Sequence, residues 1–485
     1  MFTASVADGL RAGYAAVDIT PPPEVDLTGF IARDGPCLGT LDPLEARALV
    51  FEDARGQRAA LVTCDLIGLG RNLVARVRRR VADAAGIPVE AQLFNCSHTH
   101  SGPETGVLTT IGAPDPAYLA GLEERLASVI VEAGRSPAPV RLRLAATEVG
   151  DGLVVNRVFR RVGRPDAVDR QLTVVRVEQR DGPHHLGEGR GEGDARQPLA
   201  TIVAFACHAV SLGAAERHAS ADFVAPLRRD LEAAGAGPVL YVNGCGGDVN
   251  PASMDARGRE ARDALGHRLA RYALAAVKEP TPLAPLPTGE GGTPADGGTM
   301  QAPVSGEGSG AEQVVAAAQE WVDLPFQAVR SAEDAAALLT AGRERLARAA
   351  HGSPSYRATL VTEIGYPLRL LRLHYGSEQL PQVRAEVQAI RIGPLAVVAL
   401  PGEIFSSLGR TIKAASPFAA PQTLIAGWSN DNVGYVPDRE AYPLGGYEVD
   451  LASRYYGYPA GWAPEAGDRL VAAAGRVLGQ VAAAG

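Results

Sequence analysis

Three apolar segments of this chain each end in a short polar turn that carries histidine or glycine. Residues 91–94 lead into a turn with two histidines, residues 199–207 lead into a third histidine, and residues 238–243 lead into a glycine-rich turn. Continuous apolar runs of this length are typical of strands that are buried on both faces of a sheet. In open α/β sheets ligands collect at the carboxyl ends of such strands, so these turns are where a binding site is expected.

The order of the elements predicts an α/β fold. Residues 59–64 form a nearly continuous apolar strand, residues 72–85 read as a helix that ends at Gly86 and Pro88, and another strand follows. Strand, helix and strand joined by short links are the signature of an α/β protein. We expect mixed β-sheets flanked by helices in a single large domain over residues 1–485.

Two segments of low complexity interrupt this pattern. Residues from about 183 to 197 are rich in glycine and charged side chains, and residues from about 280 to 312 are rich in proline, glycine, threonine and serine. Such segments lack the large apolar side chains that a packed core needs. We therefore expect both to be flexible surface insertions.

The composition argues against several classes of function. The net charge is −8, so there is no basic surplus for binding nucleic acid. No apolar stretch approaches the length of a transmembrane helix, and no cationic patch indicates a stable membrane anchor. The first residues lack a basic region and an apolar core, which predicts a cytoplasmic protein without a signal peptide. The five cysteines include no Cys-x-x-Cys pair, which favours packing over disulfides.

His98 and His100 stand two residues apart at the end of an apolar strand. Alternate residues of a strand point to the same face, and a neutral imidazole is the commonest metal ligand among side chains. The pair is therefore a candidate half of a metal site. The alternative is a chance pair of histidines in a loop with hydroxyl-bearing neighbours.

The other candidate ligands are each ambiguous on their own. His208 follows an apolar strand, where a histidine is more often a hydrogen-bonded core residue than a ligand. Glu403 stands at a strand-to-helix turn and could simply favour the positive N-terminus of the helix. The tyrosines of residues 435–447 are of a kind that most often pack or line a pocket.

Taken in order, these motifs resemble those of a known family. They are His-Thr-His-Ser-Gly-Pro at 98–103, Cys-His at 207–208, Gly-Asp-Val-Asn-Pro at 247–251, Pro-Gly-Glu at 401–403, Gly-Tyr-Val at 434–436 and Gly-Tyr-Glu at 446–448. The series closely resembles the catalytic domain of the neutral/alkaline ceramidases. Residues 13–21 and 43–50 also look like that family, so the resemblance spans roughly residues 12–480.

The resemblance implies a single zinc ion as cofactor. In that family two histidines, a glutamate and a tyrosine hold the metal, and the matching residues here are His98, His208, Glu403 and Tyr435. Zinc accepts nitrogen and oxygen ligands, and an open coordination position admits water. The choice of zinc over another divalent ion follows from the resemblance and not from the ligand set, because such a set accepts several metals.

The resemblance also implies three residues that act on the substrate. His100 matches a residue beside the metal for substrate contact or proton transfer. Arg157 matches an arginine that helps to hold the polar group of the substrate, and Tyr447 matches a tyrosine that hydrogen-bonds the carbonyl oxygen. Tyr442 is a rival for the last role. An arginine and a tyrosine at this place could stabilise a tetrahedral oxyanion.

The sequence departs from the family at two places. Where the family has a serine implicated in catalysis, this chain has Asn250, which has no hydroxyl to attack a carbonyl. Asn250 could instead hydrogen-bond the substrate and Asp248 could orient a ligand, or residues 248–251 could form only a tight turn. The chain ends in an alanine-rich helix, so we expect no C-terminal β-sandwich domain.

The combined pattern predicts a zinc-dependent hydrolase that cleaves the carbon–nitrogen amide bond of an N-acyl compound with metal-activated water. The expected partner is a small N-acyl or ester substrate. A soluble or smaller amide or ester fits the sequence as well as ceramide does, because no amphipathic membrane anchor is evident. The alternatives are an ester or lactone hydrolase on the same zinc site, and a non-catalytic binding protein that kept the fold.

Overall fold

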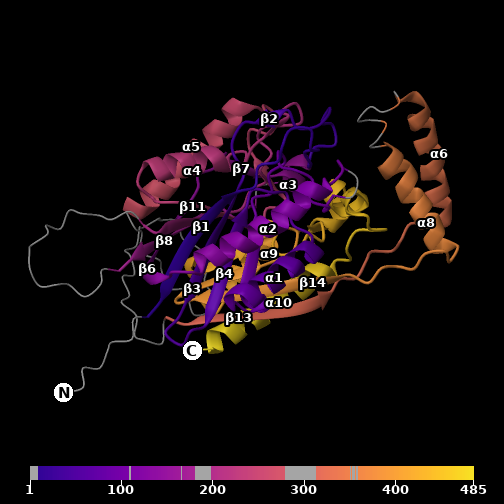
Figure 1. The fold of residues 1–485 in the computed structure, drawn as a ribbon. Helices are drawn as coiled ribbons and strands as arrows, with labels where there is room; N and C mark the ends of the chain where they lie inside the picture. Colours follow the sequence, from indigo (N-terminus) through magenta and orange to yellow (C-terminus); the bar gives the residue numbers. More distant parts are fainter. Residues whose placement is uncertain are drawn as a thin grey trace, which may run out of the picture.

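The computed structural model describes residues 9–108, 111–164, 167–180, 198–278, 313–349, 351, 356 and 359–484. The two predicted insertions, about 183–197 and about 280–312, lie outside the described residues. The described chain is a mixed α/β structure whose sheets are flanked by helices, which confirms the predicted fold class (Figure 1).

The larger main sheet has eight strands in the order β11-β9-β8-β6-β1-β3-β4-β5. In chain order the strands are β1 (Arg11–Asp18), β3 (Glu45–Glu52), β4 (Arg58–Cys64), β5 (Gln92–Cys96), β6 (Ala138–Glu148), β8 (Gln171–Gln179), β9 (Ala200–Phe205) and β11 (Val239–Asn243). Parallel pairs stand at both ends of the sheet, and the strands between them pair antiparallel. β5 is buried along its whole length, and the side chains of its two polar residues, Gln92 and Asn95, are hydrogen-bonded to backbone carbonyl oxygens.

The smaller main sheet comes from the C-terminal third of the chain. Its order is β13-β14-β15-β17, with β13 (Val315–Asp323), β14 (Arg384–Ile392), β15 (Leu395–Ala399) and β17 (Thr423–Ala426). β15 and β17 run parallel, so the turns that follow both strands emerge at the same edge of the sheet. Short two-stranded pairs extend from the main sheets: β16 (Glu403–Ile404) with β18 (Tyr435–Val436), β12 (Val249–Pro251) with β7 (Val154–Asn156), and β10 (His218–Ala219) with β2 (Gly39–Thr40).

The helices cover the sheets. Their bounds are α1 (Arg71–Ala85), α2 (Pro116–Ala133), α3 (Arg157–Arg161), α4 (Val224–Ala233), α5 (Arg259–Lys278), α6 (Ala332–Arg348), α8 (Tyr366–His374), α9 (Ser406–Ala414) and α10 (Glu465–Ala483). α2 packs on β1 and β3, α5 packs on β6 and β8, and α10 packs on β13 and β14. α1 ends at Gly86, whose φ of 65° is easily adopted by glycine, as the sequence predicted.

Two asparagines join the outermost strands of the larger sheet. The backbone N–H of Asn243, at the end of β11, donates to Asn95 Oδ1 at 2.8 Å. Asn95 Nδ2, near the end of β5, donates to the Asn243 carbonyl oxygen at 3.1 Å and to that of Gly427 at 2.5 Å. Because Gly427 follows β17, these bonds also attach the smaller sheet. The carboxyl ends of β5, β11 and β17 therefore meet at one place.

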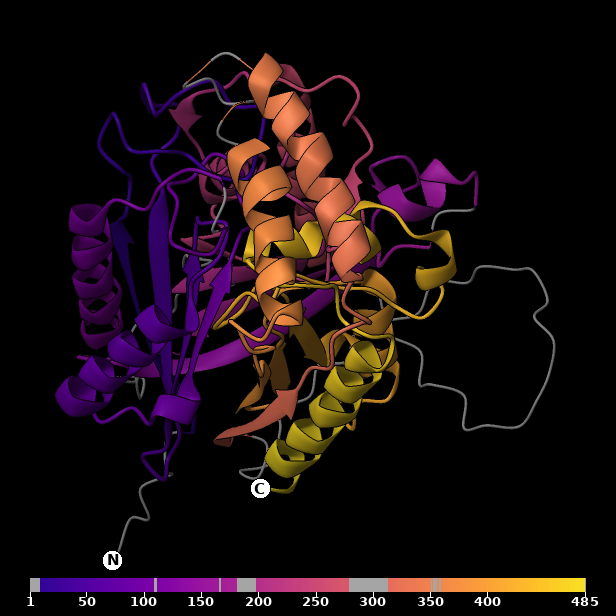
Figure 2. The same cartoon turned by 90° about the vertical axis from the view of Figure 1, so that its right-hand side faces the viewer.

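A helical hairpin of α6 and α8 projects beside the two sheets, and the two helices pack side by side (Figure 2). The sequence predicts a helix over residues 332–351, and α6 begins at the same residue but ends at Arg348. Ser331 caps it by accepting from the Asp334 N–H at 3.0 Å. Within the described residues, no helix combines the length and the apolar character needed to cross a membrane. The five cysteines are all free and buried, as expected for packing residues.

Candidate metal centre

His98 lies in the turn that follows β5 and has an unusual backbone conformation, with a φ of 59°. Its ring stacks on the indole of Trp428, with 4.4 Å between the ring centroids. Its Nδ1 is 2.7 Å from the carbonyl oxygen of Ile67, which can only accept, so Nδ1 carries the proton. The Nε2 lone pair of His98 is therefore free to bind a cation, the usual arrangement of metal-binding histidines.

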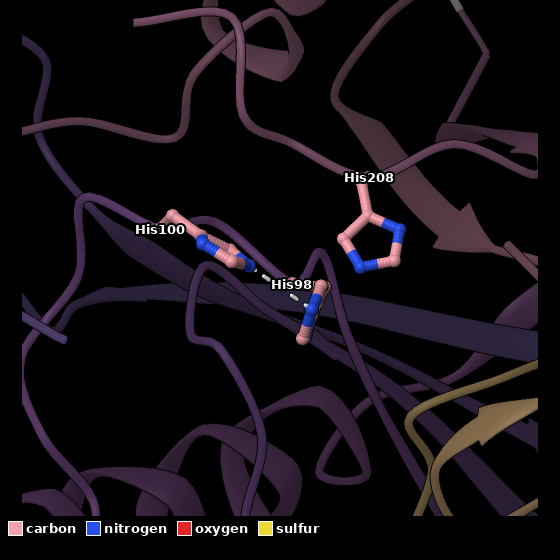
Figure 3. Close-up of side chains that lie close together, drawn as sticks. All are labelled: His98, His100 and His208. Carbon is pink, nitrogen blue, oxygen red and sulfur yellow. Dashed lines mark hydrogen bonds between the residues drawn. The ribbon is translucent and has the colours of Figure 1, made fainter. Parts of the chain in front are cut away.

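His208 follows β9 and is oriented in the same way. Its Nδ1 donates to the carbonyl oxygen of Gly246 at 2.6 Å, so its Nε2 also presents a lone pair. The rings of His98 and His208 meet edge to face, with 4.7 Å between their centroids. Figure 3 shows that these two rings and the ring of His100 gather in one place.

His100 completes a group of three histidines. Its Nε2 is 3.2 Å from Nε2 of His98, and the ligating atoms of His98, His100 and His208 all lie within 4.8 Å of one another, so the group could hold a metal ion. Because Nε2 of His98 can only accept, Nε2 of His100 carries the proton in this contact, and Nδ1 of His100, which has no hydrogen-bond partner among the described residues, bears the lone pair. Burial, with nearby positive charge, holds the pKa of His100 well below its ordinary value. The ring is therefore neutral near pH 7.

Glu403 and Tyr435 reach the histidines from the smaller sheet. The parallel pair of β16 and β18 places these two residues directly opposite each other. Glu403 Oε2 is 3.0 Å from Nε2 of His208 and 3.6 Å from Nε2 of His98. The Tyr435 hydroxyl is 3.4 Å from Nε2 of His208. The four side chains predicted as zinc ligands thus lie together.

The chemistry of this donor set suits a metal cation. Nε2 of His208 bears a lone pair and Glu403 Oε2 is an acceptor, so two acceptor atoms face each other. A proton could bridge them, but burial holds the pKa of His98 at about 3 and lowers that of His208 well below its ordinary value. A cation with nitrogen and oxygen ligands relieves the conflict, and zinc accepts such a set.

Tyr456 orients the carboxylate of Glu403. The Tyr456 hydroxyl donates to Glu403 Oε1, and this leaves Oε2 as the oxygen that faces the histidines. The sequence did not identify Tyr456 as a site residue. It predicted a helix over residues 450–456, whereas the structure has a π-helical turn over Tyr447–Leu451 and a 3₁₀ turn over Ala452–Tyr456.

Replacing Tyr456 with phenylalanine is expected to weaken zinc binding by about 10- to 100-fold, because outer hydrogen bonds of this kind hold ligands in place. The measurement is competition for zinc against a chromophoric chelator. Tyr442→Phe is the matched control, since the Tyr442 hydroxyl donates to the carbonyl oxygen of Trp462 at 2.8 Å and not to Glu403. An unchanged affinity in Tyr456→Phe would show that other contacts hold Glu403.

Arg157 stands beside Tyr435 with its charge balanced. Its Nε is 2.9 Å from Glu448 Oε1, and its guanidinium donates to the Tyr435 hydroxyl at 2.7 Å and to the Gly247 carbonyl oxygen at 3.0 Å. Its backbone N–H donates to the carbonyl oxygen of Asp248 at 2.9 Å. Side chain and backbone are both anchored, so the guanidinium has a fixed position next to a predicted ligand.

The Asp248 side chain is part of the scaffold of the site. Its carboxylate accepts from Asn156 Nδ2 at 2.6 Å and from the backbone and hydroxyl of Ser406 at 2.7 and 2.9 Å. Asp248 therefore joins the start of α3, which carries Arg157, to the start of α9. Asn250 is buried in β12, with its amide nitrogen 3.6 Å from the sulfur of Met254 and its Oδ1 without a partner in the described chain.

The structure separates the two rival tyrosines. The ring of Tyr447 lies 5.6 Å from that of Tyr435, edge to face. Burial, with the negative charge of Glu403 nearby, raises the pKa of Tyr447, so its hydroxyl keeps its proton and can donate. The hydroxyl of Tyr442 is already bound to a backbone carbonyl. The proton of the Tyr442 hydroxyl is thus already used, whereas Tyr447 keeps a proton that it can donate.

Trp428 and Glu448 are also site residues that the sequence did not identify. Trp428 follows β17 in the same way that His98 follows β5, so the rule of polar turns after apolar strands could have found it. Glu448 directly follows Tyr447 but is recognisable only through its contact with Arg157. No sequence signal predicts that contact, because the two residues are distant in the chain.

Glu104 is a buried acid in the loop that follows the histidine motif. Its Oε1 accepts from the backbone N–H groups of Gly106, Val107 and Leu108 at 2.6, 2.9 and 3.3 Å. Its Oε2 has no partner in the part of the chain that the structure describes. Burial outweighs these hydrogen bonds and raises the pKa of Glu104 to about 7.

Replacing Glu104 with glutamine is expected to change the free energy of unfolding differently at the two pH values. Relative to the unaltered chain, the variant should be more stable at pH 8 than at pH 5 by about 2–3 kcal/mol. Between pH 4.5 and about 7 the unfolded chain releases the Glu104 proton while the folded chain keeps it, so the free energy of unfolding falls as pH rises. Glutamine does not titrate in this range, so the variant does not lose stability in this way as pH rises. Chemical denaturation at both pH values measures the difference, with the exposed Glu124→Gln as control. An equal effect at pH 5 and pH 8 would contradict the prediction.

Comparison with known proteins finds similar solved structures but no similar sequence. No protein-family model matches this sequence, and no curated protein matches it. A ceramidase structure described as complexed with C2 is similar, with 18% sequence identity and a TM-score of 0.69 over 98% of this chain and 75% of that chain. Neutral ceramidase from Pseudomonas aeruginosa is similar with 17% identity and a TM-score of 0.67, over 98% and 74% of the two chains.

These similarities cover 98% of this chain. At such low identity they show the fold, and this fold agrees with the family indicated by the order of motifs in the sequence. Over almost its whole length, this chain has the fold of neutral ceramidase.

Proposed function

We propose that this protein is a zinc-dependent hydrolase that cleaves the amide bond of an N-acyl compound. The observation that carries the proposal is the convergence of His98, His208, Glu403 and Tyr435. The Nε2 lone pairs of both histidines face the acceptor Glu403 Oε2, and the Tyr435 hydroxyl lies 3.4 Å from Nε2 of His208. Such a buried set of acceptors needs a cation. Residues kept only for packing would not need to form such a set of acceptors.

The ligand residues would hold the ion from two sides. His98 and His208 would contribute Nε2 from the larger sheet, and Glu403 and Tyr435 would contribute oxygen from the smaller one. A bound zinc ion lowers the pKa of a water molecule and polarises a carbonyl group. The hydrogen bonds of the two Nδ1 atoms and of Tyr456 would keep the ligands oriented for this role.

His100, Arg157 and Tyr447 would act on the substrate. Neutral His100 has a nitrogen that can take a proton from the attacking water and pass it to the leaving amine. The guanidinium of Arg157 and the hydroxyl of Tyr447 would donate to the carbonyl oxygen as negative charge develops on it. Water and the amide would be converted to a carboxylic acid and an amine.

Asn250 makes a covalent route through its position impossible, because an amide side chain does not attack a carbonyl as a serine hydroxyl does. Its unpartnered Oδ1 is an acceptor that could contact the substrate. Direct attack of water on the amide is therefore the proposed reaction.

A panel of N-acyl amines and matched esters, assayed with zinc-loaded protein and after chelation, tests the proposal. We expect amide hydrolysis that is lost with the metal and restored by zinc. Turnover of esters alone would favour an ester or lactone hydrolase on the same site. A purified protein that holds no metal and hydrolyses neither series would favour a binding protein with this fold.

A further inference from the structure

A second cationic group lies next to the histidine group and has no part in the reaction described above. The ring of Phe30 meets that of His100 edge to face, with 5.0 Å between their centroids. Two guanidinium groups lie over the same phenyl ring, that of Arg33 at 5.2 Å and that of Arg257 at 5.5 Å. One phenyl ring thus separates each arginine from the imidazole of His100.

Arg33 is buried and fixes the backbone of the site. It donates to the carbonyl oxygens of Thr28, His100 and Glu216 at 2.8, 2.7 and 3.2 Å. Among the described residues no carboxylate lies within 4 Å of it. Burial lowers the pKa of Arg33 to about 10, so it stays charged at neutral pH. Its donors are used, but its positive charge is not neutralised by an ion pair.

Arg257 is exposed, and its donors are free of ion pairs within the described chain. Its stem rests against Gly213, where an added Cβ atom would lie 3.2 Å from the Arg257 side chain. The two carboxylates that attract it are already engaged elsewhere. Asp255 pairs with Arg160 at 2.9 Å, and Asp222 accepts from backbone N–H groups.

Partial burial lowers the pKa of Arg257, and the positive charge of Arg157 lowers it further. The two guanidiniums therefore repel each other beside the same site. Arg157 differs from Arg257 in having Glu448 as a close counter-ion. An anion bound at Arg257 would remove the repulsion and use a charged donor that the protein leaves unpaired.

Resting on the proposed function, we propose that the substrate carries a carboxylate on its amine side and that Arg257 binds this carboxylate. The amine side follows from His100, which would protonate the leaving amine and which Phe30 joins to Arg257. A carboxylate whose carbon lies two bonds from the scissile nitrogen is the defining feature of N-acyl α-amino acids. A neutral amine fragment would leave Arg257 without a partner.

The test compares N-octanoylglycine with N-octanoylglycinamide, which differ only in the charge of the amine fragment. With the zinc-loaded full chain, release of octanoate from the acid should exceed that from the amide by about 10- to 100-fold in kcat/KM. In Arg257→Gln this ratio should fall to near one. Arg271→Gln, an exposed arginine on α5 with the same loss of charge, should keep the ratio of the unaltered chain.

Binding of N-octanoylglycine to the metal-free chain, measured by calorimetry, gives a second readout that needs no catalysis. It should weaken about tenfold or more in Arg257→Gln. If both compounds are hydrolysed equally, or the ratio survives in Arg257→Gln, the carboxylate proposal fails while the hydrolase stands. If neither compound is hydrolysed but the acid binds through Arg257, the hydrolase fails and the anion site stands. Absence of both binding and acid preference overturns the anion site.

Discussion

Replacing His208 with alanine is expected to remove zinc from the protein and to lower amide hydrolysis by about 10³-fold or more, since the metal supplies several kcal/mol of transition-state stabilisation. Nε2 of His208 lies 3.0 Å from Glu403 Oε2, closer than Nε2 of His98 at 3.6 Å. Its loss would also remove one of the two donors to the Gly246 carbonyl oxygen, which still accepts from the Val249 N–H at 3.0 Å. The measurements are the zinc content per chain and kcat/KM on an N-acyl amine.

His208 is a cleaner choice than His98 for this experiment. The backbone of His98 has a positive φ, so a substitution there also changes backbone strain. His218→Ala is the matched control, because that histidine is partly exposed and is not one of the predicted ligands. Its Nδ1 lies 2.6 Å from Glu216 Oε1. A His208→Ala protein that keeps one zinc per chain and its hydrolysis would contradict the predicted ligand set.

Replacing Arg157 with alanine is expected to lower kcat by about 10²- to 10³-fold while zinc remains bound, as is typical when one donor to a developing oxyanion is lost. Arg157 contacts Tyr435 but not the histidine nitrogens, so its removal should leave the nitrogen ligands in place. Glu448 would lose its close counter-ion, which also disturbs the local charge.

The matched control for this variant is Arg161→Ala. Arg161 is on the same short helix, α3, and also pairs with Glu448, at 3.4 Å, but its side chain is largely exposed. Kinetics at saturating zinc separate a loss of catalysis from a loss of metal. A kcat for Arg157→Ala within a few-fold of the unaltered chain, or a fall matched by Arg161→Ala, would show that Arg157 has a structural role only.

Parts of the fold were predictable because their local sequences are unambiguous. β9 is rich in apolar residues, β5 contains the apolar residues of the predicted run 91–94, and each strand is followed by a histidine-bearing turn. β13 was not predicted: its sequence, VAAAQEWVD, is rich in alanine, which favours helices. Its pairing with β14 over nine residues decides its conformation. Tertiary pairing overrides a weak local preference in this case.

Parts of the candidate site were predictable for a different reason. His98 and His100 stand out by their spacing, but Glu403 and Tyr435 could be assigned only through the order of motifs that resembles the ceramidases. Tyr456 belongs to none of these motifs, although its hydroxyl orients Glu403. A tyrosine can be recognised as a site residue only when the partner of its hydroxyl is known, and the sequence does not show that partner.

The sequence by itself determined the class of fold and the identity of the chemical groups. Apolar periodicity sets which segments become strands and helices, and the histidines and acids are visible as residue types. The tertiary structure decided which groups meet. The bonds of Asn95 with Asn243 and Gly427 bring together strand ends that are far apart in sequence, and only there do the acceptor atoms converge. The physical reason is that strand propensity is local, whereas the contacts of a site are not.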